Sequence, residues 1–336
     1  MTGSLLQALP DLLDDEPALT GVMGRRHAVL AVPEAARAIV LAAIARQTGR
    51  RPVIVAVPTG TEAEFLAADL RQYMGPDQVE LFPAWETLPF ERVSPGVETM
   101  GRRLHVLHRL TDLVDRPRVV VASGRALVQR LGPGAGDSPP LRLGPGDVIA
   151  QTSLVADLVA TGYRREYQVE HRGEVAVRGS IVDIWPSTAD APVRLDLWGD
   201  EIDSIRAFDP DTQLSTTMMD SITVIPARET LPGLTASDRL RALTSSMDLS
   251  SCNVSTQQRI SEELDLFLEG NEVEDSQFYA GLFNRGSVLD YFPEDGVRVM
   301  YRPTDIVEAA WATDERAHEL RQAKERRGEL PANFPS

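Results

Sequence analysis

The chain has 336 residues, of which 43% are hydrophobic and 25% charged, the composition of a globular protein with room for two or three domains. No stretch approaches the roughly 18 apolar residues of a membrane-spanning helix, and the single cysteine, Cys252, excludes an intrachain disulfide framework and a cysteine-rich zinc site. The formal net charge of −16 disfavours nucleic-acid binding by the chain as a whole, because such binding needs a positive field. The acidic N-terminus lacks the basic region of a signal peptide, so a cytoplasmic location is expected.

The first third of the chain alternates between two patterns. Continuous apolar runs, typical of strands buried on both faces, occur at 53–57, 79–82 and 119–122. Segments with the apolar spacing of helices lie beside them, at 34–46, 62–73, 97–110 and 124–131. This alternation predicts a parallel sheet covered by helices on both faces.

A Pro/Gly-rich segment, GPGAGDSPPLRLGPGD (132–147), predicts a domain junction. After it, a helix at 153–163 precedes short alternating runs that predict strands at 166–170, 174–177, 180–185, 193–198 and 202–208. Turn-forming sequences such as Gly199-Asp200 separate these runs. The middle of the chain is therefore expected to form a small antiparallel sheet.

Helices return from about residue 230. Ser255 and Gln258 have the spacing of a capping box, and an apolar face follows before Gly270, the predicted end of that helix. The residues of that face are Ile260, Leu264, Phe267 and Leu268. One more strand at 297–301 and a long helix at 304–326 close the chain, so a β-rich segment is expected to interrupt one α/β domain.

The segment GVMGRRHA (21–28) resembles the turn that opens a nucleotide-binding domain. A phosphate cradle needs G-x-x-x-x-G-K-[ST], in which backbone N–H groups and the Lys hold phosphates and the hydroxyl holds Mg²⁺. Here Gly21 and Gly24 are followed by Arg25, Arg26 and His27, with no Gly-Lys-Ser/Thr nearby. Residual anion binding at a helix N-terminus is one interpretation. A solvated turn is the other, and the missing Lys and hydroxyl favour it.

Four stretches carry longer and more specific patterns: LFPAWETLPFERVSP (81–95), GYRREYQVEHRGEVAVRGSIVDIWP (162–186), RLDLWGDEIDSIRAFDPDTQ (194–213) and DYFPEDGVRVM (290–300). In residues and order they resemble the N-terminal module of the bacterial transcription-repair coupling factors (Mfd), which is related to the excinuclease B subunit (UvrB). The resemblance implies an α/β fold with a degenerate P-loop, helicase-like domain of the UvrB domain 1 type. Its halves would be residues 1–142 and 229–336, and residues 143–228 would form an inserted α+β adaptor with an antiparallel sheet.

The chain departs from excinuclease B where that subunit carries its chemistry. The P-loop is replaced by GVMGRRHA, and the strand that follows YFPEDG reads VRVMYRPTD, without the acidic pair that serves Mg²⁺. Little room is left between Pro83 and the helix near Val97 for a DNA-inserting hairpin, and the second helicase domain does not fit in the remaining residues. We therefore expect no ATP hydrolysis, no motor action, no cofactor and no bound metal in this chain.

Arginines gather in the predicted adaptor of an otherwise acidic chain: Arg164, Arg165, Arg172 and Arg178, with Trp185 at the end of the next strand. Arg offers a fork of donors for carboxylates and Trp offers rigid apolar area, and both are enriched in interaction hot spots. On the residues alone, a Trp packed in the small core with solvated arginines explains the pattern equally well. The resemblance favours an interface, because in that family this segment binds the excinuclease A subunit (UvrA). Trp stands here where Phe is common in the family.

Two further clusters predict structure rather than chemistry. His105 and His108 have an i,i+3 spacing compatible with zinc, but no cysteine or acidic ligand accompanies them at ligand spacing. The acidic residues between 196 and 211 lack the spacing of a calcium-binding loop, so turn chemistry is expected at Asp200 and Asp209.

The resemblance therefore predicts a non-catalytic module that recruits UvrA to a lesion marked by stalled RNA polymerase, in transcription-coupled nucleotide excision repair. The family's complete protein is an ATP-dependent DNA translocase, and the domains that contact RNA polymerase and DNA are expected to lie outside this chain, which we take to be a fragment. Two competing hypotheses are an ATP-dependent enzyme of the excinuclease B type and a free-standing DNA-binding domain. Affinity for Mg·ATP would favour the first, and salt-sensitive binding to duplex DNA the second. No membrane partner is expected.

Overall fold

The computed structural model describes residues 5–132, 135–230, 241, 242, 245, 247–269, 271, 273, 275–294 and 296–335. They divide into two compact units. The first unit comprises Met1–Ala84, Arg109–Gln129 and Ser287–Thr313, and the second comprises Trp85–His108, Arg130–Gly286 and Asp314–Ser336. Among the described residues, no helix is both long enough and apolar enough to cross a membrane.

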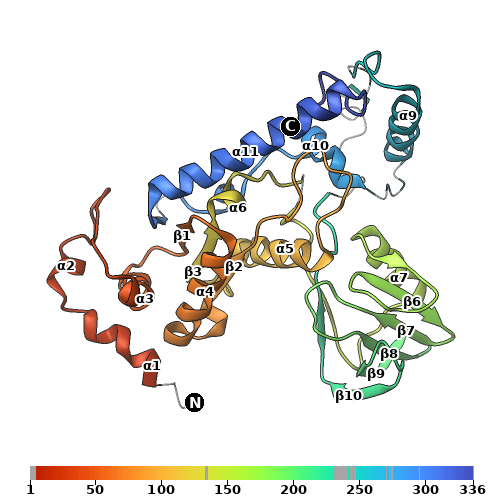
Figure 1. The fold of residues 1–336 in the computed structure, drawn as a ribbon. Helices are drawn as coiled ribbons and strands as arrows, with labels where there is room; N and C mark the ends of the chain where they lie inside the picture. The colour runs from red at the N-terminus through yellow and green to blue at the C-terminus, as the bar shows by residue number, and fades with distance from the viewer. Residues whose placement is uncertain are drawn as a thin grey trace. The chain divides into compact units, whose positions relative to one another are not determined.

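The first unit is built on a parallel sheet of four strands in the order β12-β1-β3-β2. The strands are β1 (Val53–Val57), β2 (Val79–Phe82), β3 (Val119–Ser123) and β12 (Val297–Met300). Every residue of β1 and β3 is buried, which explains their uninterrupted apolar sequences. The predicted parallel sheet is confirmed: β1, β2 and β3 lie together (Figure 1), and the edge strand β12, from the far end of the sequence, pairs with β1.

Helices α3 (Arg37–Gln47) and α4 (Gly60–Met74) bury their small and apolar residues against this sheet. Thr59 caps α4, since its side chain accepts from the N–H of Glu62 while the Glu62 carboxylate accepts from the N–H of Thr59. The other elements of this unit are short: α1 (Leu5–Ala8), η1 (Leu9–Leu13), α2 (Pro17–Thr20), η2 (Glu34–Ala36), η3 (Pro76–Gln78), α6 (Gly124–Val128) and η6 (Val288–Tyr291). Two longer helices, α5 (Val97–Thr111) and α11 (Pro303–Arg326), have residues in both units.

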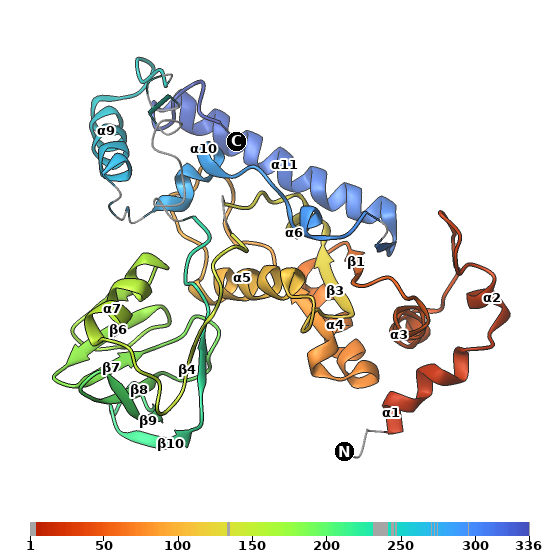
Figure 2. The same cartoon turned by 180° about the vertical axis from the view of Figure 1, so that it is seen from behind.

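The second unit contains a sheet of six strands in the order β10-β9-β8-β7-β6-β5 (Figure 2). They are β5 (Arg164–Arg165), β6 (Glu174–Arg178), β7 (Ile181–Ile184), β8 (Val193–Trp198), β9 (Glu201–Phe208) and β10 (Ser215–Met219). All neighbours are antiparallel except β5 and β6. Helix α7 (Gln151–Ala160) and the pair β4 (Leu141–Leu143) and β11 (Ile222–Val224) pack their apolar residues into the same core as one face of this sheet.

The antiparallel sheet that we predicted is confirmed, but one of its strands was placed wrongly. Residues 166–170 form no strand, and the strand pairing with β6 is Arg164–Arg165 instead. Within 166–170 the apolar residue Val169 is buried against Ala176 and Phe208, so its burial comes from a loop that crosses the sheet and not from strand alternation. The strands β4, β10 and β11 were not predicted, because they are short and β10 is exposed and polar or Met-rich.

A second core of this unit is aromatic and lies where α9 (Val254–Leu268), η5 (Ser276–Tyr279) and α10 (Ala280–Phe283) come together. The predicted apolar face of α9 is confirmed by the burial of Ile260, Leu264 and Phe267. The predicted capping box was wrong: Asn253 caps the helix, and its side chain accepts from the N–H of Thr256. The predicted helix end at Gly270 lies outside the described residues.

Candidate functional site

The six-stranded sheet has two chemically different faces, because side chains alternate along each strand. One face is apolar and packs with α7, β4 and β11. On the other face the strand register aligns Ala176, Asp183, Arg194 and Arg206 across four neighbouring strands, and Arg178 follows two residues after Ala176 on β6. We call these five residues the charged face.

Asp183 is the centre of the charged face. Its side chain is 1% exposed, and its carboxylate accepts from Nε of Arg194 at 2.7 Å, from Nη2 of Arg194 at 2.9 Å and from Nη2 of Arg178. The hydrogen bond to Asp183 raises the pKa of Arg194, which keeps that guanidinium charged despite its partial burial. One carboxylate thus holds two guanidinium groups, and the group of three carries one net positive charge.

The loop between β9 and β10 adds hydrogen bonds to both arginines of this network through Gln213. Gln213, in the left-handed region at φ 62°, accepts from Arg178 at 3.3 Å through its side chain and from Nη1 of Arg194 at 3.2 Å through its carbonyl. Its amide donates to the carbonyl of Val169 at 3.2 Å, which ties the 166–170 loop to the same place. Asp183 and Gln213 therefore hold Arg178, whose side chain is still 38% exposed.

The remaining predicted residues lie on or beside this sheet. Arg164 and Arg165 form the exposed edge strand β5, and Nη2 of Arg164 lies 3.4 Å from the buried carboxylate of Glu174. Arg172 lies over the ring of Trp185 at 5.7 Å, and both side chains donate to the carbonyl of Ala189. Trp185 is half-buried beside the small apolar cluster of Val169, Ala176 and Phe208.

Asp183, Arg194 and Gln213 were missed at the sequence level. A signal existed for two of them: Asp183 and Arg194 alternate with apolar residues on β7 and β8, which places them on the face opposite to the core. No local signal marks Gln213, because its role depends on a loop folding back over the sheet.

The segment that resembles a phosphate-binding turn (21–28) does not lead directly into a helix, unlike a working phosphate cradle. Gly21 follows the short helix α2 and its N–H donates to the carbonyl of Pro17, while Gly24 has φ 77°. Arg25, Arg26 and His27 are exposed. Residues 25–33 separate these glycines from η2 and α3, so the turn does not directly open the helix.

The carboxyl end of the parallel sheet is where ligands bind in open α/β sheets. Here Tyr301, whose N–H donates to Ala56 at the end of β1, has two guanidinium groups over its ring, Arg37 at 4.5 Å and Arg302 at 5.1 Å. Arg302 also pairs with Glu62 of α4. The side chains at this edge are therefore engaged with one another.

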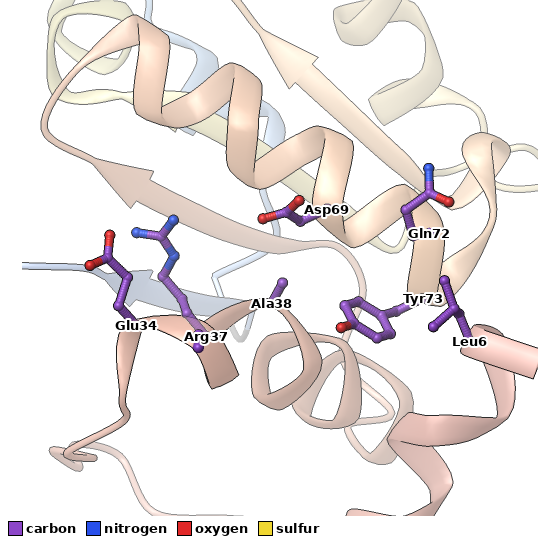
Figure 3. A pocket seen from close by; sticks show the side chains of 8 residues that line it. Leu6, Glu34, Arg37, Ala38, Asp69, Gln72 and Tyr73 are labelled. Atoms are coloured by element: carbon purple, nitrogen blue, oxygen red, sulfur yellow. The ribbon is translucent and has the colours of Figure 1, made fainter.

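A cavity of about 390 Å³ lies between α3, α4 and α1 and shares Arg37 with this edge (Figure 3). Three charged side chains line it: Glu34, Arg37 and Asp69. Two carboxylates against one guanidinium give the lining a net negative charge, which disfavours a polyphosphate.

The other clusters behave as structural features. His105 and His108 are partly buried on α5, next to the buried Leu104 and Leu107, and the described residues contain no group of three or more His, Cys, Asp or Glu that could hold a metal ion. The predicted turn at Asp209 is confirmed, since its carboxylate accepts from the N–H groups of 211 and 212. The hydrogen bonds from Thr212 also lower the pKa of the Asp209 carboxyl.

Comparison with known proteins places these features in a family context. Residues 141–229 match the model of the UvrB interaction domain, and this range covers β4 through β11 and contains the charged face. The transcription-repair-coupling factor of Mycobacterium bovis is 41% identical over 201 residues, which are 58% of this chain and 16% of that protein. Those of Myxococcus xanthus and Escherichia coli are each 34% identical, over 65% and 43% of this chain and 17% and 12% of the relatives.

The matched part thus spans 16% of the mycobacterial relative's length, about a sixth. Residues 141–229 match the UvrB interaction domain, and about half of the chain is similar to bacterial transcription-repair-coupling factors.

Proposed function

We propose that this chain recruits the excinuclease A subunit (UvrA) through its charged face and so serves to pass a stalled transcription complex to nucleotide excision repair. The observation that carries the proposal is the arginine pair held by Asp183 within the matched UvrB interaction domain. Contacts to RNA polymerase and DNA are assigned to the parts of the family's longer proteins that this chain does not match.

The charged face suits a partner that presents carboxylates. Arg178 is held by Asp183 and Gln213, so little side-chain freedom is lost when a carboxylate binds its exposed edge. A charge-assisted Arg–carboxylate bond is roughly twice as strong as a neutral hydrogen bond. Arg164 and Arg165 on β5 extend the positive surface along the sheet edge.

The direct test is binding of UvrA to the chain and to a variant with Arg164, Arg165 and Arg178 all changed to Ala. Each true hot-spot arginine contributes about 1–3 kcal/mol, so the triple variant is expected to bind far more weakly. Its fold is expected to persist, because Arg194 still satisfies Asp183. Arg142→Ala, on the exposed side of β4, is the matched control and should bind normally. A triple variant that binds as tightly as the parent would refute the surface.

We further propose that residues 1–142 and 229–336 form a degenerate helicase-like domain interrupted by the adaptor at 143–228. Strand β12, from the second segment, pairs with β1 from the first, which supports this division. The Arg302–Glu62 pair at the carboxyl end of the sheet and the negative lining of the neighbouring cavity support the loss of nucleotide binding. On this proposal the chain has no ATPase activity, and Gly21, Gly24, Arg25 and Arg26 belong to a relic of the nucleotide site.

A calorimetric titration with Mg·ATP tests the degenerate site. No binding is expected up to millimolar nucleotide. Measurable affinity that falls when Arg25 or Arg26 is changed to Ala would instead favour the ATP-dependent enzyme. Salt-sensitive binding to duplex DNA by this chain alone would favour the free-standing DNA-binding domain, against which its net charge of −16 argues.

A further inference from the structure

We propose that Tyr167 is the aromatic contact of the UvrA-binding surface and that it acts together with Arg164, Arg165 and Arg178. We call these four residues the arginine–tyrosine patch. The inference rests on the proposed function, and it assigns the aromatic contact to a residue other than Trp185.

The side chain of Tyr167 is 89% exposed, although the loop that carries it is held at both ends. Before it, the N–H of Glu166 donates to the carbonyl of Val175 at 2.9 Å, which continues the pairing of β5 with β6. After it, Val169 is fully buried against Ala176 and Phe208. An aromatic ring in full contact with solvent on an anchored backbone has no role in the core, and it binds a partner at little entropic cost.

The same anchoring brings Tyr167 close to the charged face. The amide of Gln213 donates to the carbonyl of Val169 at 3.2 Å, and its oxygen accepts from Arg178 at 3.3 Å. Tyr167 lies two residues before Val169, so their Cα atoms are at most about 7 Å apart. On its other side Tyr167 follows two residues after Arg165. Tyr167 therefore lies in the short segment between the arginines of β5 and Val169, whose carbonyl is linked through Gln213 to Arg178 on β6.

Trp185 is less accessible to a binding partner than Tyr167. Its indole N–H already donates to Ala189 at 3.1 Å, Arg172 lies over its ring, and the rest of the side chain packs beside Phe208 and Val169. Arg172 thus covers one face of the ring, and only part of the side chain is exposed. The contacts of Trp185 instead support the 166–170 loop that presents Tyr167.

Tyr167 and Trp198, the two exposed aromatic residues of the adaptor, differ in the charges that surround them. Trp198 is 84% exposed, but it lies at the β8–β9 turn, directly across from Glu201 and two residues before Asp200. A partner rich in carboxylates is repelled there. Beside Tyr167 the single carboxylate of Glu166 stands against the two guanidinium groups of Arg164 and Arg165, so the local charge is positive and attracts such a partner. The phenol can also donate a hydrogen bond to a carboxylate that an arginine neighbour holds.

The experiment measures the affinity of UvrA for the full chain and for four variants: Tyr167→Ala, Tyr167→Phe, Trp198→Ala and Trp185→Phe. We expect Tyr167→Ala to weaken binding by about tenfold or more, as for a moderate hot spot. Trp198→Ala removes an equally exposed aromatic ring from the same sheet and should change affinity by less than about twofold. Tyr167→Phe separates the contribution of the hydroxyl from that of the ring.

Each outcome has one meaning. The midpoint of urea unfolding should be the same for Tyr167→Ala and the parent, because the side chain is exposed. If the parent binds UvrA and the triple arginine variant does not, but Tyr167→Ala binds like the parent, then Tyr167 is not a contact while the proposed function stands. A larger loss in Trp185→Phe than in Tyr167→Ala would also overturn the assignment. If the parent does not bind UvrA at all, both the function and this inference are refuted.

Discussion

Two buried carboxylates in the second unit make nearly the same contact and serve different purposes. Glu229 is fully buried and pairs with Arg103, which is also fully buried, and it accepts from the indole N–H of Trp85 at 2.9 Å. Asp183 is equally buried but pairs with Arg178, which is 38% exposed. The carboxylates are alike, and the exposure of the arginine distinguishes a pair enclosed in the fold from the pair that we propose meets a partner.

The difference has an energetic basis. A pair buried on both sides has lost the hydration of both ions, so removing one partner leaves an uncompensated charge in the interior. A pair with one exposed arginine keeps part of its hydration and can exchange it for a partner's carboxylate. The burial of the arginine therefore predicts whether a substitution harms folding or binding.

The largest effect is expected at the fully buried pair. Arg103→Met removes the guanidinium from Glu229 and should lower the free energy of unfolding by about 3–5 kcal/mol. Urea unfolding monitored by tryptophan fluorescence measures this loss. The double variant Arg103→Met, Glu229→Gln should recover part of it, because the unpaired charge is gone. A loss below about 1 kcal/mol in the single variant would show that the interior tolerates the Glu229 charge, and the comparison would fail.

Asp183→Asn should have a smaller effect on stability and a clear one on binding. The variant keeps the size of the side chain but weakens the charge-assisted bonds to Arg178 and Arg194, which costs about 1–3 kcal/mol of unfolding free energy. UvrA affinity should fall as well, since both arginines lose their fixed orientation. Arg178→Ala gives the converse pattern, a small loss of stability with a larger loss of affinity. If Asp183→Asn destabilised the chain and left UvrA affinity unchanged, the orientation of the arginines would have no role in binding.

A third network, whose carboxylate is more exposed than Glu229 and Asp183, makes the comparison sensitive to pH. Glu263 is 13% exposed and accepts from Arg92, Arg259 and the hydroxyl of Tyr279. Burial alone raises the pKa of the Glu263 carboxyl, but the hydrogen bonds from Tyr279, Arg259 and Arg92 outweigh it and lower the pKa below the ordinary 4.5. The carboxylate therefore stabilises the fold fully above pH 4.5, and this contribution is lost as the pH falls through the lowered pKa.

Glu263→Gln removes that pH-dependent contribution. At pH 7 the variant should be less stable by about 1–2 kcal/mol, through the loss of charge-assisted hydrogen bonds. The difference from the parent should shrink as the pH is lowered below 4.5. Urea midpoints measured between pH 7 and pH 3 check this. Parallel curves for parent and variant across that range would contradict the lowered pKa.

The two sheets show how much of the fold and of the candidate site can be predicted from the sequence. The parallel strands were predicted almost to the residue, because runs such as VIVAV at Val53–Val57 are buried on both faces and have no other interpretation. The adaptor's arginines were found by their clustering, but their order of importance was not. It depends on which carboxylate each one meets, and contacts such as Arg178 with Asp183 and Gln213 are set by strand register and by a loop with a positive φ. Tyr167 has no sequence signal at all, since only the structure tells an exposed tyrosine from a buried one.

The smallest effect is expected for the surface pair in the first unit. The side chains of Arg302 and Glu62 are 44% and 28% exposed, so water screens their attraction, and Arg302→Ala should lower the free energy of unfolding by about 1 kcal/mol or less. Arg302 has φ 53°, a conformation that any side chain with a Cβ adopts at a cost. Arg302→Gly loses the same ion pair but removes this cost, so it should be as stable as the parent or slightly more stable than it. The urea midpoints of the parent and both variants test the point directly: if Arg302→Gly were less stable than the parent by as much as Arg302→Ala, the left-handed backbone would carry no cost here and the lost side-chain contacts alone would explain both losses.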